Sequence, residues 1–138
     1  MRYVLILLTL LGIIASTLAL REHYRTEGDS PCSINERWDC GIVNHSPYAA
    51  QWGIPIAFFG IAGYVLMGAL AWRRAYAILL AAALAGLAYS LYLAHIEATI
   101  LGVWCIYCVI SLADISLITV LALGTTLGSL FRKSSALA

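Results

Sequence analysis

Four long apolar runs constrain the fold of this 138-residue chain more than any other feature. Each holds about 20 residues, the length that an α-helix needs to cross the hydrocarbon core of a bilayer. Apolar residues make up 62% of the chain and charged residues 11%, whereas soluble domains have about half and about a quarter. We therefore expect an all-α membrane protein, a four-transmembrane-helix bundle that forms one domain, residues 1–138. The expected helices are residues 3–20, 54–72, 75–94 and 103–124.

The longest polar segment, residues 21–53, lies between the first two runs and is rich in the turn-forming residues Gly, Pro, Asn and Asp. We expect it to be a long loop outside the membrane. The first run, preceded by Arg2, also resembles a signal peptide. Its apolar part of about 18 residues exceeds the usual length of roughly 7–15, so we expect it to be retained as a helix.

Basic residues indicate the orientation of the bundle, because loops on the cytoplasmic side retain Lys and Arg. Those at one end of the expected bundle, with no acid among them, are Arg2, Arg73, Arg74, Arg132 and Lys133. We therefore expect a multi-pass protein of the cell membrane with both termini in the cytoplasm and the long loop outside. The net charge of +1 gives no indication of a nucleic-acid partner.

The four cysteines form two pairs, both on the expected non-cytoplasmic side, where disulfides persist. Cys32 and Cys40 lie in the long loop, and Cys105 and Cys108 form a C-x-x-C at the start of the fourth helix. The free amides of a first helical turn favour a reactive thiolate there. Two neighbouring dithiols can exchange disulfides with each other, which indicates thiol redox chemistry.

Two other interpretations of the cysteines remain open at this point. Cys32 and Cys40 could form a structural disulfide, which would make the chain a non-enzymatic tetraspan protein with a stapled outer loop. The four cysteines could also bind zinc. We expect no metal, because the seven residues between Cys32 and Cys40 are a poor zinc-binding spacing and an oxidising compartment works against permanent thiolates.

Several short motifs together resemble the vitamin K epoxide reductase family. They occur in the order expected for that family: Cys32 to Cys40, Asn44-His45-Ser46-Pro47-Tyr48-Ala49, Trp52-Gly53-Ile54-Pro55, and Cys105-Ile106-Tyr107-Cys108. The resemblance implies a membrane enzyme that passes two electrons between a disulfide and a quinone. In microbial members, the electrons come from a thioredoxin-fold protein, so that exported proteins gain disulfides. Many of these members carry a fused thioredoxin-like domain. We expect a separate partner here.

The resemblance also implies a role for each cysteine. Cys105 and Cys108 would be the active-site pair, with Cys108 facing a quinone of the menaquinone or ubiquinone type. Cys32 and Cys40 would be the shuttle, in which Cys40 exchanges with Cys105 and the partner attacks Cys32. Ser46 matches a family serine near the quinone, although it could equally cap a short helix that begins at Pro47.

Helix periodicity adds candidates for the wall of a quinone pocket. Ser111 and Leu112 lie three and four residues after Cys108 and therefore share its helix face. Tyr89 and Tyr92 could form a flat wall on the third helix, although bundle packing and an interfacial aromatic belt explain them as well.

Three further residues of the expected helices suggest contacts between them. Asp114 is an acid well inside the fourth helix, where charges are costly, so we expect a hydrogen bond to Thr9, Ser16 or Thr17 of the first helix. Gly60 and Gly63 are expected to let two helices approach closely.

Overall fold

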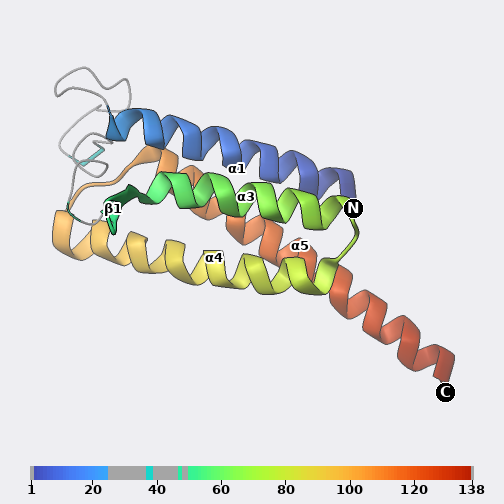
Figure 1. The fold of residues 1–138 in the computed structure, drawn as a ribbon. Helices are drawn as coiled ribbons and strands as arrows, with labels where there is room; N and C mark the ends of the chain where they lie inside the picture. The colour runs from blue at the N-terminus through green and yellow to red at the C-terminus, as the bar shows by residue number, and fades with distance from the viewer. Residues whose placement is uncertain (1, 25–36, 39–46, 48–49, 138) are drawn as a thin grey trace.

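The computed structural model describes residues 2–24, 37–38, 47 and 50–137. Four helices of this part form a bundle in which sequential neighbours are antiparallel (Figure 1). They are α1 (Arg2–His23), α3 (Ile56–Trp72), α4 (Tyr76–Ile96) and α5 (Ile106–Leu137). Helix α1 packs against α3 and α5, and α4 packs against the same two helices, so the four close into a ring. Cys32, Cys40 and Ser46 lie outside the described residues.

The all-α membrane class predicted from the sequence is confirmed. Among the described residues, three segments are long and apolar enough to cross a bilayer, namely Arg2–His23, Tyr76–Leu101 and Ile106–Ala136. Helix α3 is a shorter apolar helix of 17 residues. Large apolar side chains such as Leu7 and Val120, each 65% exposed, point away from the bundle. Lipid tails would surround such an exterior, because apolar side chains interact more favourably with lipid than with water.

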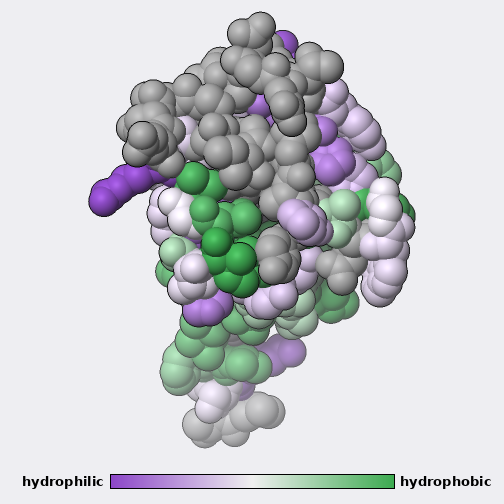
Figure 2. All heavy atoms as spheres, turned by 90° about the vertical axis from the view of Figure 1, so that its left-hand side faces the viewer, coloured by the Kyte–Doolittle hydropathy of each residue, from purple (hydrophilic) through white to green (hydrophobic). Residues whose placement is uncertain are grey.

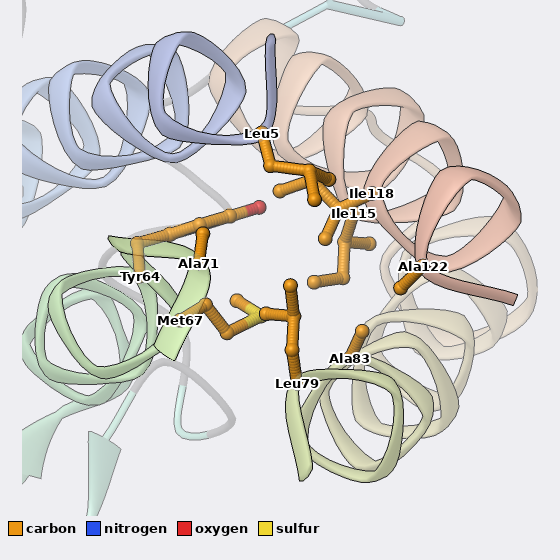
Figure 3. Close-up of a cluster of buried hydrophobic side chains, with 9 residues drawn as sticks. All are labelled: Leu5, Tyr64, Met67, Ala71, Leu79, Ala83, Ile115, Ile118 and Ala122. Atoms are coloured by element: carbon orange, nitrogen blue, oxygen red, sulfur yellow. The ribbon is translucent and has the colours of Figure 1, made fainter. Parts of the chain in front are cut away.

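The core lies where side chains of all four helices meet (Figure 3). Leu5 of α1, Met67 of α3, Leu79 of α4 and Ile118 of α5 are each at most 4% exposed. Tyr64 and Ile115 also belong to this cluster, together with three small residues: Ala71, Ala83 and Ala122. Because α3 and α4 are joined by only three residues, with Arg74 in a left-handed conformation at φ 58°, the two helices must run antiparallel.

Close approach between α1 and α3 depends on glycines. The Cα of Gly12 in α1 lies directly against the ring of Tyr64, and Gly60 in α3 faces Ser16, so the expectation for Gly60 is confirmed. The expectation for Gly63 is wrong, because a side chain there would meet no atom within 4 Å. Gly63 instead lines a cavity described below.

The ends of the helices differ from the expected boundaries. The chain forms a two-residue hairpin, β1 (Ala50–Gln51) paired with β2 (Ile54–Pro55), before α3 begins. Residues Trp52 and Gly53 both have positive φ in its turn, as a tight hairpin turn requires. Helix α4 was expected to end at residue 94, but it reaches Ile96 and continues as the π-helix η2 (Glu97–Leu101). Gly102, at φ 68°, then ends the helix.

Asp114 does not make the contact predicted for it. It is 2% exposed, and neither carboxylate oxygen has a hydrogen-bond partner among the described residues. Thr9 and Thr17 instead donate to carbonyl oxygens of their own helix, Ile6 and Ile13. A helix satisfies threonine hydroxyls internally, so these residues were not available to the acid.

Candidate functional site

The C-x-x-C pair lies at the end of the bundle opposite the two termini, where α5 begins (Figure 1). Cys105 is fully buried, whereas Cys108, one turn further into the helix, is partly exposed. No disulfide joins them in this structure, and their side chains lie near enough to interact with each other. The pair can therefore close into a disulfide after small side-chain movements, because C-x-x-C sulfurs one turn apart are neighbours.

An acid that sequence reasoning missed lies beside the two cysteines. Glu97, the first residue of η2, is only 4% exposed. Its Oε2 accepts a hydrogen bond from the backbone N–H of Cys105 at 3.3 Å, and its carboxyl group lies near enough to the Cys108 side chain to interact with it. The sequence predicted a loop around Glu97. An acid eight residues before Cys105, at the end of an apolar helix, was the signal that could have identified it.

This contact also changes the expectation about the amides at the start of α5. The N–H of Cys105 was expected to favour a thiolate, but it already donates to a carboxylate. The polar group beside the sulfurs thus comes from η2, through Glu97, as well as from the start of α5.

The long loop touches the chain immediately before the cysteine pair. Trp38 forms a parallel β-bridge with Trp104, and the N–H of Trp104 donates to the carbonyl oxygen of Arg37 at 2.7 Å. These two contacts attach the loop to the residue that precedes Cys105. In the sequence, Cys40 follows Trp38 by two residues.

A cavity of about 230 Å³ lies between the helices and reaches the cysteine pair. Its walls are mostly apolar and come from all four helices, and its lining includes Cys108 and Glu97 but not Cys105. Among the residues predicted for a pocket wall, the lining includes Ser111, Leu112 and Tyr89. Figure 2 views this end of the bundle, where hydrophobic side chains (green) are visible between hydrophilic ones (purple).

Tyr92 does not line this cavity. It borders a separate hollow together with Pro47, Ala50 and Trp52, next to the β-hairpin. Tyr89 borders both hollows, and its ring centroid lies 6.1 Å from that of Tyr92. The structure therefore brings Tyr89 to the cavity that contains Cys108 and places Tyr92 outside it, while the ligand of either residue stays a prediction.

The cavity also contains a polar pair that links α3 to α5. The hydroxyl of Tyr64 lies 2.8 Å from the hydroxyl of Ser111 and donates to the carbonyl oxygen of Ser111 at 3.0 Å. Tyr64 is 3% exposed, and both residues line the cavity. These hydroxyls are polar groups in a mostly apolar wall, and Ser111 lies one turn below Cys108. Sequence reasoning predicted Ser111 but not Tyr64.

The chain was compared with curated proteins and with sequence models of protein families. No curated protein matches it. The sequence model of the vitamin K epoxide reductase family matches residues 3–123, which include all four cysteines and the whole bundle up to the middle of α5. This match covers well over half of the chain and agrees with the resemblance of the cysteine motifs. The chain therefore belongs to the vitamin K epoxide reductase family and is a membrane oxidoreductase.

Proposed function

We propose that this protein oxidises a dithiol partner outside the cytoplasm and passes the electrons to a membrane quinone, so that exported proteins gain disulfides. The observation that carries the proposal is the position of Cys108, whose thiol lines an apolar cavity inside a membrane helix bundle. Family membership supplies the reaction class, thiol and quinone redox chemistry. Cys105 is fully buried and does not line the cavity. It directly follows Trp104, which the loop contacts through Trp38.

The cavity suits a quinone head group of the menaquinone or ubiquinone type. Such a ring is flat and apolar with two carbonyl acceptors, and the wall offers apolar side chains together with the hydroxyls of Tyr64 and Ser111. Leu112 and Tyr89 would cover the ring, and Cys108 would adjoin it. The quinone supplies a two-electron acceptor when it is bound. Ser46, which the family pattern places near the quinone, remains part of the proposal, as does Tyr92 on the basis of the sequence.

The four cysteines would act in sequence. The partner, a separate thioredoxin-fold protein, attacks Cys32 and reduces the Cys32–Cys40 disulfide. Cys40 then attacks Cys105 of the Cys105–Cys108 disulfide and frees Cys108, and Cys32 attacks Cys40 and frees Cys105. Each attack forms one S–S bond and breaks another, so the electron pair moves toward Cys108. The bridge between Trp38 and Trp104 supports this transfer, because it attaches the loop to the residue next to Cys105.

The membrane arrangement would be four crossings with both termini in the cytoplasm. Helix α3, with 17 residues, is about 25 Å long, at the lower limit for a crossing. Both ends of the chain lie at the same end of the bundle, and the cysteine pair lies at the other (Figure 1). The basic residues near the termini favour a cytoplasmic location for that end of the bundle. The cysteine pair would then lie on the oxidising side of the membrane.

The test is electron transfer by the purified protein in detergent. Given a reduced thioredoxin-fold protein and decylubiquinone, it should form one quinol for each partner disulfide, and Cys108→Ser should abolish this activity. A non-enzymatic tetraspan protein would instead keep its disulfides when the partner is added. Absence of quinol formation by the wild type with both the protein partner and dithiothreitol would refute the proposal.

A further inference from the structure

We propose that Glu97 is a catalytic residue that accepts the proton of the Cys108 thiol when the Cys105/Cys108 pair is oxidised. The inference rests on the proposed function and assigns a proton carrier to it. Four observations on the molecule point to this residue, and they concern its contacts, its burial, its place in the cavity wall and the backbone that positions it.

The contacts of Glu97 are with the reacting groups themselves. Its Oε2 accepts the N–H of Cys105, and its carboxyl group lies near enough to the Cys108 side chain to interact with it. A proton acceptor must lie within hydrogen-bond reach of the proton that it removes, and this arrangement meets that requirement. Glu97 also lines the same cavity as Cys108, so the carboxyl group adjoins the space proposed for the quinone.

Burial indicates that the acid is retained for chemistry. A glutamate that is only 4% exposed in the outer part of a membrane bundle is costly, and such residues usually take part in function. The π-helical turn that begins at Glu97 is itself rare and occurs frequently at functional sites. Asp114 is equally buried but has no hydrogen-bond partner among the described residues, so burial alone does not bring an acid to the sulfurs.

The chemistry balances with the groups present and a quinone as oxidant. The S–H bond of Cys108 breaks, its proton passes to the Glu97 carboxylate, and the electron pair stays on the sulfur. The S–S bond to Cys105 then forms as the Cys105 proton is lost and two electrons pass to the quinone. In the net reaction, a dithiol and a quinone become a disulfide and a quinol, which carries both electrons and both protons. Glu97 passes on the Cys108 proton and returns to the carboxylate.

A purely structural role makes a different prediction. If Glu97 only accepts the N–H of Cys105, then a glutamine, whose amide oxygen also accepts a hydrogen bond, would replace it without loss. Glu97→Gln therefore separates the two roles, because it keeps the shape and the acceptor but cannot take a proton. A positioned acid or base typically contributes about 10²–10⁴-fold to a rate.

The experiment measures decylubiquinone reduction with dithiothreitol as donor, which bypasses the loop cysteines. We expect Glu97→Gln to lower kcat by about 10²-fold, while diamide still converts its Cys105/Cys108 pair to the disulfide as readily as in the wild type. Formate added to Glu97→Ala should restore part of the rate, because a small carboxylate can occupy the space left by the side chain. Asp114→Asn, the same chemical change at a buried acid away from the cysteines, is the matched control and should retain the wild-type rate.

The outcomes distinguish the two proposals. An active wild type together with a fully active Glu97→Gln would overturn the role of Glu97 and leave the proposed function intact. An impaired Glu97→Gln whose pair no longer forms the disulfide with diamide, together with a Glu97→Ala that formate does not rescue, would show a structural role and overturn it as well. A wild type that reduces no quinone would overturn both proposals.

Discussion

The contact between Gly12 and Tyr64 gives a prediction whose magnitude follows from the structure. In Gly12→Ala, the new methyl group would occupy the space of the Tyr64 ring edge, so the ring must move. Overpacking of this kind costs about 1–3 kcal/mol, and loss of the hydrogen bonds from Tyr64 to Ser111 costs about 1 kcal/mol more. The higher helix propensity of Ala returns about 1 kcal/mol. We expect a net destabilisation of about 1–3 kcal/mol, the sum of these effects.

The matched control is Gly63→Ala, a glycine of α3 at which a Cβ would meet no atom within 4 Å. It should be as stable as the wild type or more stable by up to about 1 kcal/mol, through helix propensity alone. Both free energies can be measured by circular dichroism as SDS unfolds the protein in mixed micelles. If Gly12→Ala proves as stable as Gly63→Ala, then the packing of α1 on α3 described here is wrong.

Three further predictions concern the cavity, the relay and the topology. Tyr64→Phe should lower the unfolding free energy by about 1 kcal/mol, and adding Ser111→Ala should cost little more, because Tyr64→Phe has already removed the hydrogen bond between the two hydroxyls; additive losses in the SDS titration would contradict this pairing. In a variant that lacks Cys32 and Cys108, the remaining Cys40 and Cys105 should form one disulfide, so that fragments cleaved between them stay joined in non-reducing electrophoresis; separate fragments would show that the loop pair is only a structural staple. A reporter fused after Lys133 should be cytoplasmic, and an impermeant thiol reagent should label reduced Cys32 from outside; an external reporter would place both cysteine pairs on the reducing side and refute the oxidative pathway.

Part of the site could be predicted from the sequence, because it depends only on the spacing of residues along one helix. The C-x-x-C spacing puts two sulfurs on one turn, and a spacing of three and four residues puts Ser111 and Leu112 on the helix face of Cys108, where the cavity lies. The prediction that Tyr89 and Tyr92 form one aromatic wall was correct for only one of them, because Tyr89 lines the cavity and Tyr92 does not. Helix periodicity gives the direction of a side chain but not the helix that it meets.

The sequence by itself determined the all-α membrane class, because the number and length of apolar runs suffice for that conclusion, and the order of the cysteine motifs indicated the family. Only the tertiary structure placed Glu97 beside Cys108, Tyr64 against Gly12 and Trp38 beside Trp104, and it left Asp114 without the partner expected for it. Each of the three contacts joins residues from different elements. Such contacts depend on how each helix is rotated about its own axis and on how far the π-helix after Ile96 extends α4. A local sequence pattern specifies neither of these.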